Sequence, residues 1–164
     1  MKQPLILLTA LLACTGAYAN TTINGSVESK CIITTDTDGV YGNPTGDVLS
    51  TKPTDGGVTP IIRYDIITAD AYVAKITHPD SFTSSPSLDD TVTWTGESEA
   101  GQMSDSTMSA FNTNKVEYNN TTEFDLSVAG SVWFDVTSEA DYGYEKAFPA
   151  GNYSAVVTAE CIAQ

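Results

Sequence analysis

Apolar and polar residues alternate along most of this chain, and turn-forming residues interrupt the alternation at short intervals. No window of eleven residues combines the i, i+3, i+4, i+7 spacing of an amphipathic helix with good helix formers. Thr, Val, Tyr and Ile dominate the apolar segments, and these residues favour strands. The predicted strands are residues 22–27, 30–35, 58–68, 71–77, 91–95, 122–128, 131–137 and 152–162.

Between these segments, Gly, Pro, Asn, Asp and Ser predict turns and loops. Ala129-Gly130 predicts a hairpin between two of the strands, and a short helical turn is expected near residues 106–111. About eight short strands at roughly ten-residue spacing predict an all-β fold, specifically an immunoglobulin-like antiparallel β-sandwich. The remaining turns and loops are expected at residues 36–39, 41–46, 54–57, 79–90 and 96–110.

The first nineteen residues have the features of an export signal. Lys2 precedes the apolar run Pro4–Ala13, which is too short to span a bilayer as a helix, and Ala17-Tyr18-Ala19 is a small-x-small cleavage site. We therefore expect a mature chain that begins at Asn20. An alternative remains open, because Leu-Leu-Ala before Cys14 resembles a lipobox, which would give a lipoprotein anchored at Cys14.

The charge of the chain is strongly negative. Seven Lys and Arg residues stand against 21 Asp and Glu residues, and loss of Lys2 with the signal changes the net charge from -14 to -15. Such a surface repels nucleic acid, so no nucleic-acid partner is expected. The hydrophobic share of 41% is too high for a disordered acidic tail and is enough for a core.

Two cysteines, Cys31 and Cys161, remain after the expected cleavage. An even pair in an exported chain predicts one disulfide, with two free buried thiols as the alternative. The bridge would bring the first and last strands of the domain together.

The residues that could carry chemistry are few. His78 is the single histidine and is expected at the surface, at the end of a strand, without a nucleophile and an acid beside it. Asp36 and Asp38 before Gly39 resemble part of a calcium loop in which Asp47 could be the last ligand, but no flanking helices are predicted. We predict no catalytic residues, no metal and no cofactor, so the chain is not expected to be an enzyme. A solvated turn is the alternative to calcium binding at the two aspartates.

Both ends of the mature chain alternate with period two. In residues 20–29, Ile23, Gly25 and Val27 share one face of an extended strand, so the central position of that face has no side chain. This segment lies outside the predicted disulfide loop and is interpreted as a detachable strand, with an ordinary first strand as the alternative. The last strand places one set of residues on a single face: Tyr153, Ala155, Val157, Ala159 and Cys161.

These ends carry a resemblance to a known family. The export signal, the alternating N-terminal segment with a Gly, the Thr-rich β domain and the final Gly-Asn-Tyr-Ser-Ala-Val-Val strand together resemble the major subunits of chaperone–usher fimbriae, most closely the colonisation-factor type. A bridge from Cys31 to Cys161 departs from the cysteine pattern of that family. The resemblance implies an incomplete sandwich that lacks its last strand, completed by a donor strand from a neighbouring subunit.

The resemblance also implies partners and site residues. Residues 30–164 would form the pilin domain of an exported subunit in an extracellular fimbria for adhesion or biofilm formation. Its partners would be identical subunits in a head-to-tail filament, a periplasmic chaperone and an outer-membrane usher. A secreted or periplasmic carbohydrate-binding β-sandwich is the alternative of another class. The donor positions would be Thr21, Ile23, Gly25, Val27 and Ser29, and the chaperone-facing positions would be Tyr153, Ala155, Val157 and Ala159.

Overall fold

The computed structural model describes residues 22–26, 28, 30–68 and 71–164. This part of the chain consists of antiparallel strands and two short 3-10 helices, so the prediction of an all-β antiparallel fold is confirmed. The expected helical turn is present as η2. The strands are β1 (Cys31–Thr37), β2 (Gly42–Thr45), β3 (Val48–Ser50), β4 (Ile61–Ile66), β5 (Tyr72–Thr77), β6 (Thr93–Thr95), β7 (Ser98–Met103), β8 (Lys115–Tyr118), β9 (Thr121–Leu126), β10 (Gly130–Val136), β11 (Glu139–Asp141) and β12 (Thr158–Ala163), and the helices are η1 (Pro53–Asp55) and η2 (Ser106–Ala110).

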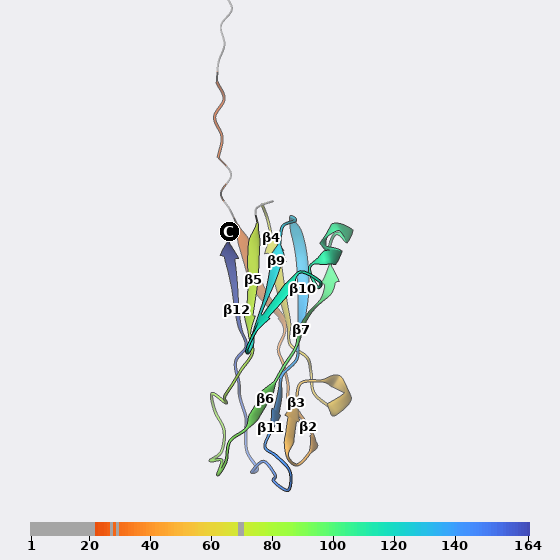
Figure 1. Ribbon diagram of the computed structural model, residues 1–164, viewed down its shortest axis with the longest axis vertical. Helices are drawn as coiled ribbons and strands as arrows, with labels where there is room; N and C mark the ends of the chain where they lie inside the picture. Colours follow the sequence, from red (N-terminus) through yellow and green to blue (C-terminus); the bar gives the residue numbers. More distant parts are fainter. Residues whose placement is uncertain (1–21, 27, 29, 69–70) are drawn as a thin grey trace, which may run out of the picture.

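Hydrogen bonds join the strands into three sheets of four strands, with the orders β1-β4-β10-β7, β12-β5-β9-β8 and β2-β3-β11-β6. The third sheet lies at one pole of the molecule, and the first two occupy the rest of its length (Figure 1). β10 leads into β11 and β6 leads into β7, so the third sheet continues the first. β1 and β12 are both edge strands, each in a different sheet.

The hydrophobic core lies between the first two sheets, because alternate residues of the central strands point into it. Phe124 of β9 and Phe134 of β10 come from different sheets, and their ring centroids are 4.3 Å apart. Tyr64 of β4 meets Phe134 edge-on at 5.5 Å, a geometry that aromatic rings favour. The remaining buried members of this cluster are Ile62, Ile66, Tyr72, Ala74, Ile76, Met108, Phe111, Leu126, Val132 and Val136.

Several sequence predictions about strands are wrong. The hairpin at Ala129-Gly130 does not exist, because β9 pairs with β5 and β8 whereas β10 pairs with β4 and β7. Segments expected to be turns or loops contain β2 and β7, and the strands β3, β8 and β11 were not predicted. The predicted strand 152–162 begins its ladder only at Thr158, and residues 22–26 belong to no strand.

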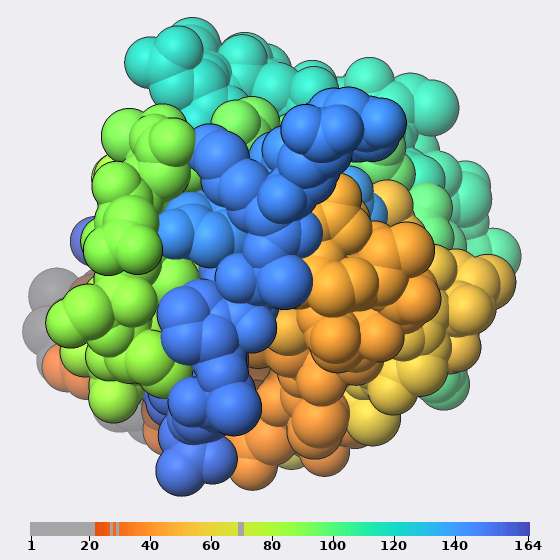
Figure 2. Space-filling model, turned by 90° about the horizontal axis from the view of Figure 1, so that it is seen from below, coloured from red at the N-terminus to blue at the C-terminus, as the bar shows by residue number. Residues whose placement is uncertain are grey.

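The two poles of the molecule differ. β12 ends at the pole where residues 22–26 extend away from the sheets (Figure 1). Seen from the opposite pole, the blue segment that precedes β12 lies beside the orange residues of β2 and β3 (Figure 2). Neither of the helices in the described residues has the length and apolar character that a membrane span requires.

Candidate functional site

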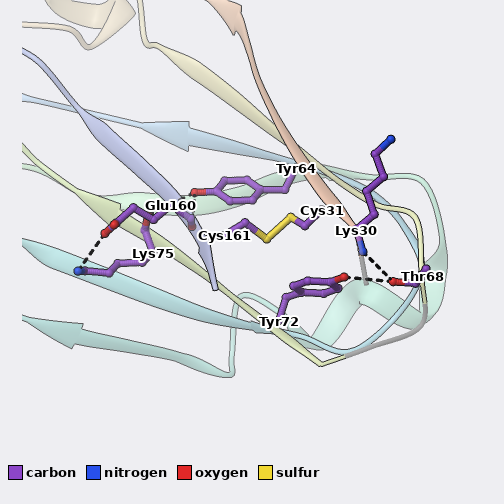
Figure 3. Close-up of a disulfide and its surroundings, with 8 residues drawn as sticks. All are labelled: Lys30, Cys31, Tyr64, Thr68, Tyr72, Lys75, Glu160 and Cys161. Atoms are coloured by element: carbon purple, nitrogen blue, oxygen red, sulfur yellow. Dashed lines mark hydrogen bonds and ion pairs between the residues drawn. A yellow bond between two sulfur atoms is a disulfide. The ribbon is translucent and has the colours of Figure 1, made fainter. Parts of the chain in front are cut away.

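The predicted disulfide is present and joins the edges of the two main sheets. Cys31 at the start of β1 and Cys161 of β12 are bonded, with their Cα atoms 6.4 Å apart (Figure 3). Beside the bridge, the Tyr64 hydroxyl lies 3.3 Å from the carbonyl oxygens of Lys75 and Glu160, to which it can donate. The bridge therefore fixes the first strand against the last at one point along their length.

Beyond the bridge, the edges separate and leave a groove. A cavity of about 300 Å³ lies between the end of β1 and residues 155–157. A second cavity of about 400 Å³ follows it toward the opposite pole, and the two share Gly39, Tyr41 and Ala155. We call this continuous depression the edge groove. Its lining residues are Thr35, Thr37, Asp38, Gly39, Val40, Tyr41, Leu49, Thr51, Pro60, Ile62, Pro79, Ser138, Gly151, Tyr153, Ser154, Ala155, Val156 and Val157.

The floor of the edge groove reaches the hydrophobic core. Ile62, a core residue of β4, lines the first cavity beside Tyr41. The Tyr41 hydroxyl is 2.9 Å from the hydroxyl of buried Ser138, and burial raises the pKa of this tyrosine. Near the other end of the groove, the ring of Tyr153 packs against Phe82, with centroids 5.1 Å apart. The groove thus has an apolar and aromatic floor.

One wall of the edge groove is an extended segment whose backbone is mostly unpaired among the described residues. Residues 153–157 alternate between half-buried and exposed, which is the pattern of a strand with one face on the core. Ser154 exchanges backbone hydrogen bonds with Ser84. Within the described part of the chain, no hydrogen bond involves the backbone of Ala155, Val156 or Val157. Such groups normally pair with another strand or with water, so this wall can accept a strand.

The predicted chaperone-facing residues do share one face. Tyr153, Ala155, Val157 and Ala159 are all half-buried, and the residues between them are exposed. Only Ala159 lies in β12, where it pairs with Ile76 of β5. The other three line the edge groove.

The predicted donor segment is only partly described. Ile23 is 92% exposed, and no atom lies within 4 Å of the place where a Cβ on Gly25 would be. These two residues therefore make no contact with the core of their own domain. Thr21, Val27, Ser29 and the expected export signal with Cys14 lie outside the described residues.

The expectation of a surface position for His78 is wrong. Its side chain is buried at the end of β5, with Nδ1 3.1 Å from the Thr137 carbonyl oxygen and Nε2 2.9 Å from the Ser98 hydroxyl. A carbonyl oxygen only accepts, so Nδ1 carries the proton and Nε2 accepts from Ser98. Burial lowers the pKa of His78.

Asp36 and Asp38 are not close ligands of one site. Asp36 of β1 accepts a hydrogen bond from the Trp133 indole at 2.6 Å and lies 3.4 Å from Arg63, whereas Asp38 lines the edge groove. The described residues contain no group of three or more His, Cys, Asp and Glu side chains arranged to hold a metal ion.

A second surface feature surrounds Trp94 of β6. This half-buried residue and Asp80 line two neighbouring hollows of about 340 and 490 Å³. Its ring packs against Phe82 at 4.7 Å, and its indole nitrogen has no hydrogen-bond partner among the described residues. Glu117 and Asn119 also line the smaller hollow, so polar side chains stand next to an aromatic ring. The sequence did not single out this combination.

Comparison with known proteins gives no match: no family model, no curated protein and no solved structure is similar to this chain. Any functional assignment therefore depends on the geometry of the chain itself.

Proposed function

We propose that this protein is the structural subunit of an extracellular fimbria that polymerises by donor-strand exchange. One observation carries the proposal: an unpaired edge groove and an exposed, alternating N-terminal extension lie toward opposite poles of the same domain. In this proposal the domain is an immunoglobulin-like sandwich that lacks one strand. A strand from a neighbouring subunit would occupy the groove in the place of the missing strand.

The positions of the groove and the extension support a head-to-tail filament. A segment that leaves one subunit at the disulfide pole can enter the groove of the next subunit from its other pole. The two surfaces differ, so the contact is heterologous and repeats without closing into a ring. Export through the periplasm, assembly by a chaperone and an usher, and a role in adhesion or biofilm formation are parts of the same proposal.

The energetics favour insertion of a strand over solvent exposure. Ile23 is almost fully exposed in its own subunit, and burial of such a side chain is worth roughly 1.5–3 kcal/mol. The inserted backbone would also pair with Ala155, Val156 and Val157, which lack partners among the described residues. Residues 20–26 carry no charged side chain, so the segment avoids repulsion from an acidic neighbour.

The decisive experiment compares the full chain with a deletion of residues 20–29. We expect the deleted chain to fold and to bind a chaperone but to form no filaments in electron micrographs. Two single substitutions add a matched comparison. Ile23→Asp should block assembly because it would bury an unpaired charge, whereas Asn24→Asp places the same charge on the other face and should be tolerated. A deleted chain that assembles like the full chain would refute the proposal.

Carbohydrate binding at Trp94 is the second candidate, favoured by the half-buried ring between two hollows that combine apolar and polar side chains. Sugars stack their apolar faces on aromatic rings while amides and carboxylates bind their hydroxyls. Titration with a panel of neutral oligosaccharides should change the fluorescence of the wild type and of Trp133→Phe but not of Trp94→Phe. An unchanged spectrum for wild type with the whole panel would contradict this candidate.

A further inference from the structure

The direction of an inserted strand follows from the two poles. Residues 151–157 run toward the disulfide pole, and β1 runs away from it (Figure 1). The extension also leaves its domain at the disulfide pole, so the extreme N-terminus leads when it enters the neighbouring groove. An inserted segment is then antiparallel to residues 151–157 and parallel to β1.

The disulfide limits how far the strand can enter. Neighbouring strands are about 4.8 Å apart, so a strand between two others needs about 10 Å between them. At the bridge, the Cα atoms of Cys31 and Cys161 are only 6.4 Å apart. The inserted end must therefore stop before it reaches the level of Cys161.

The sizes of the side chains then select one register. In an antiparallel pair, residues directly opposite each other point to the same side. Ala155 is the smallest half-buried residue of the groove wall, and Ile23 is the largest apolar residue of the extension before residue 27. With Ile23 opposite Ala155, Gly25 lies opposite the Tyr153 ring. A large residue then meets a small one at both positions.

Two neighbouring registers keep the same side chains pointing toward the core, and both fit the groove less well. Insertion two residues deeper takes Asn20 to the level of Glu160, beside the bridge, where no strand fits. Insertion two residues less deep places Ile23 opposite Tyr153, so two bulky side chains compete, and leaves Val157 without a partner.

On the basis of the proposed function, we propose that the inserted segment is residues 20–26 of a second copy, with Ile23 opposite Ala155, and that the disulfide is the stop that sets this register. The mature N-terminus expected at Asn20 then lies opposite Thr158, three residues before Cys161 of the bridge. Val27 lies at the mouth of the groove, opposite Gly151, and Ser29 lies beyond it, in the connection between subunits. This assignment narrows the five predicted donor positions to three that are fully inserted: Thr21, Ile23 and Gly25.

Cysteine pairs test the register in filaments of the full-length chain. Opposite residues of antiparallel strands have Cα atoms about 4.5–5.5 Å apart, which a disulfide spans, whereas positions offset by two residues exceed its usual reach. Ile23→Cys is combined in turn with Ala155→Cys, Tyr153→Cys and Val157→Cys. After mild oxidation, non-reducing gels report covalent ladders, and peptide mapping verifies that the native bridge is intact.

We expect the pair at positions 23 and 155 to give at least tenfold more ladder than the other two pairs. A second pair in the same register, Thr21→Cys with Val157→Cys, should also cross-link. A dominant ladder from position 23 with 153 or 157 would overturn the register but leave donor-strand exchange standing. Filaments that form normally but cross-link with none of these pairs would overturn both the register and the proposed function.

Discussion

Removal of the disulfide should destabilise the domain by a large part of its total stability. The bridge joins residues separated by 130 positions, and the chain-entropy model gives about 5 kcal/mol for a loop of this length. Whole domains are typically stable by about 5–15 kcal/mol. The double variant Cys31→Ser, Cys161→Ser should therefore unfold at a much lower urea concentration than the wild type.

The assay is urea unfolding followed by fluorescence of Trp94 and Trp133. Three samples are compared: oxidised wild type, wild type kept reduced with dithiothreitol, and the double serine variant. The last two should agree, because both lack the same constraint. Their denatured state is less compact than that of the oxidised chain, so the dependence of the unfolding free energy on urea should become steeper.

A loss below about 1 kcal/mol would refute this reasoning, since the model for long loops gives several times that value. It would mean that the reduced denatured chain already keeps its ends together, or that strain in the native bridge offsets the entropy. A reduced wild type that is much less stable than the serine variant would also contradict it. In that case the lost thiol packing, rather than the open loop, would govern the result.

Three further predictions concern single residues. Gly42→Ala should lower the free energy of unfolding in urea by about 1–3 kcal/mol, because its Cβ would overlap the Asp55 carbonyl oxygen. Gly46→Ala should be nearly neutral, because the nearest atom to its Cβ would be the Ala147 Cβ at 3.4 Å; equal losses for the two variants would contradict this. Tyr64→Phe should lower the free energy of unfolding by about 1 kcal/mol, because the ring stays packed and only the hydroxyl beside the Lys75 and Glu160 carbonyls is removed. Phe134→Ala, which removes a whole buried ring, should lower it by about 3–5 kcal/mol. An equal loss for Tyr64→Phe would show that the hydroxyl matters more than the ring. Burial lowers the pKa of His78, so the unfolded state binds the proton first as the pH falls, and the contribution of this residue to stability is complete above pH ~6.5 and declines below it. Between pH 7.5 and 5.5, the free energy of unfolding should therefore decrease less for His78→Gln than for wild type. Equal decreases would contradict this prediction.

The alternation of residues predicted which side chains enter the core but not which strands pair. Both β9 and β10 bury every second residue, as the pattern around Ala129-Gly130 suggested. A period of two is equally compatible with a hairpin in one sheet and with a connection that crosses from one sheet to the other. Here the chain crosses, and Phe124 meets Phe134 across the core instead of beside it. Only the tertiary structure distinguishes the two arrangements.

The missed strands share a different cause. β2 and β7 have the sequences GNPT and SEAGQM, which lack alternation and strand-forming composition, and the four residues KVEY of β8 alternate over too short a stretch to predict a strand. β7 and β8 are extended because predicted strands pair with them: β10 with β7, and β9 with β8. The burial of His78 has the same kind of origin, since Ser98 and Thr137, which satisfy its ring nitrogens, come from segments distant in sequence.

The sequence could not predict the edge groove, although it predicted the disulfide beside the groove and the strand that forms one of its walls. The cysteines predicted that the first and last strands meet, and the alternation of residues 153–157 predicted a strand face on the core. The sequence pattern cannot show that a strand lacks a neighbour, because apolar and polar residues alternate in the same way in a paired and in an unpaired strand. The groove appears only in the tertiary structure, where a cavity separates the end of β1 from residues 155–157 and the backbone of these three residues has no partner among the described residues. An unpaired edge of this kind is an aggregation hazard in a free chain, and the donor-strand proposal assigns its protection to residues 20–26 of a second copy, which carry no charged side chain.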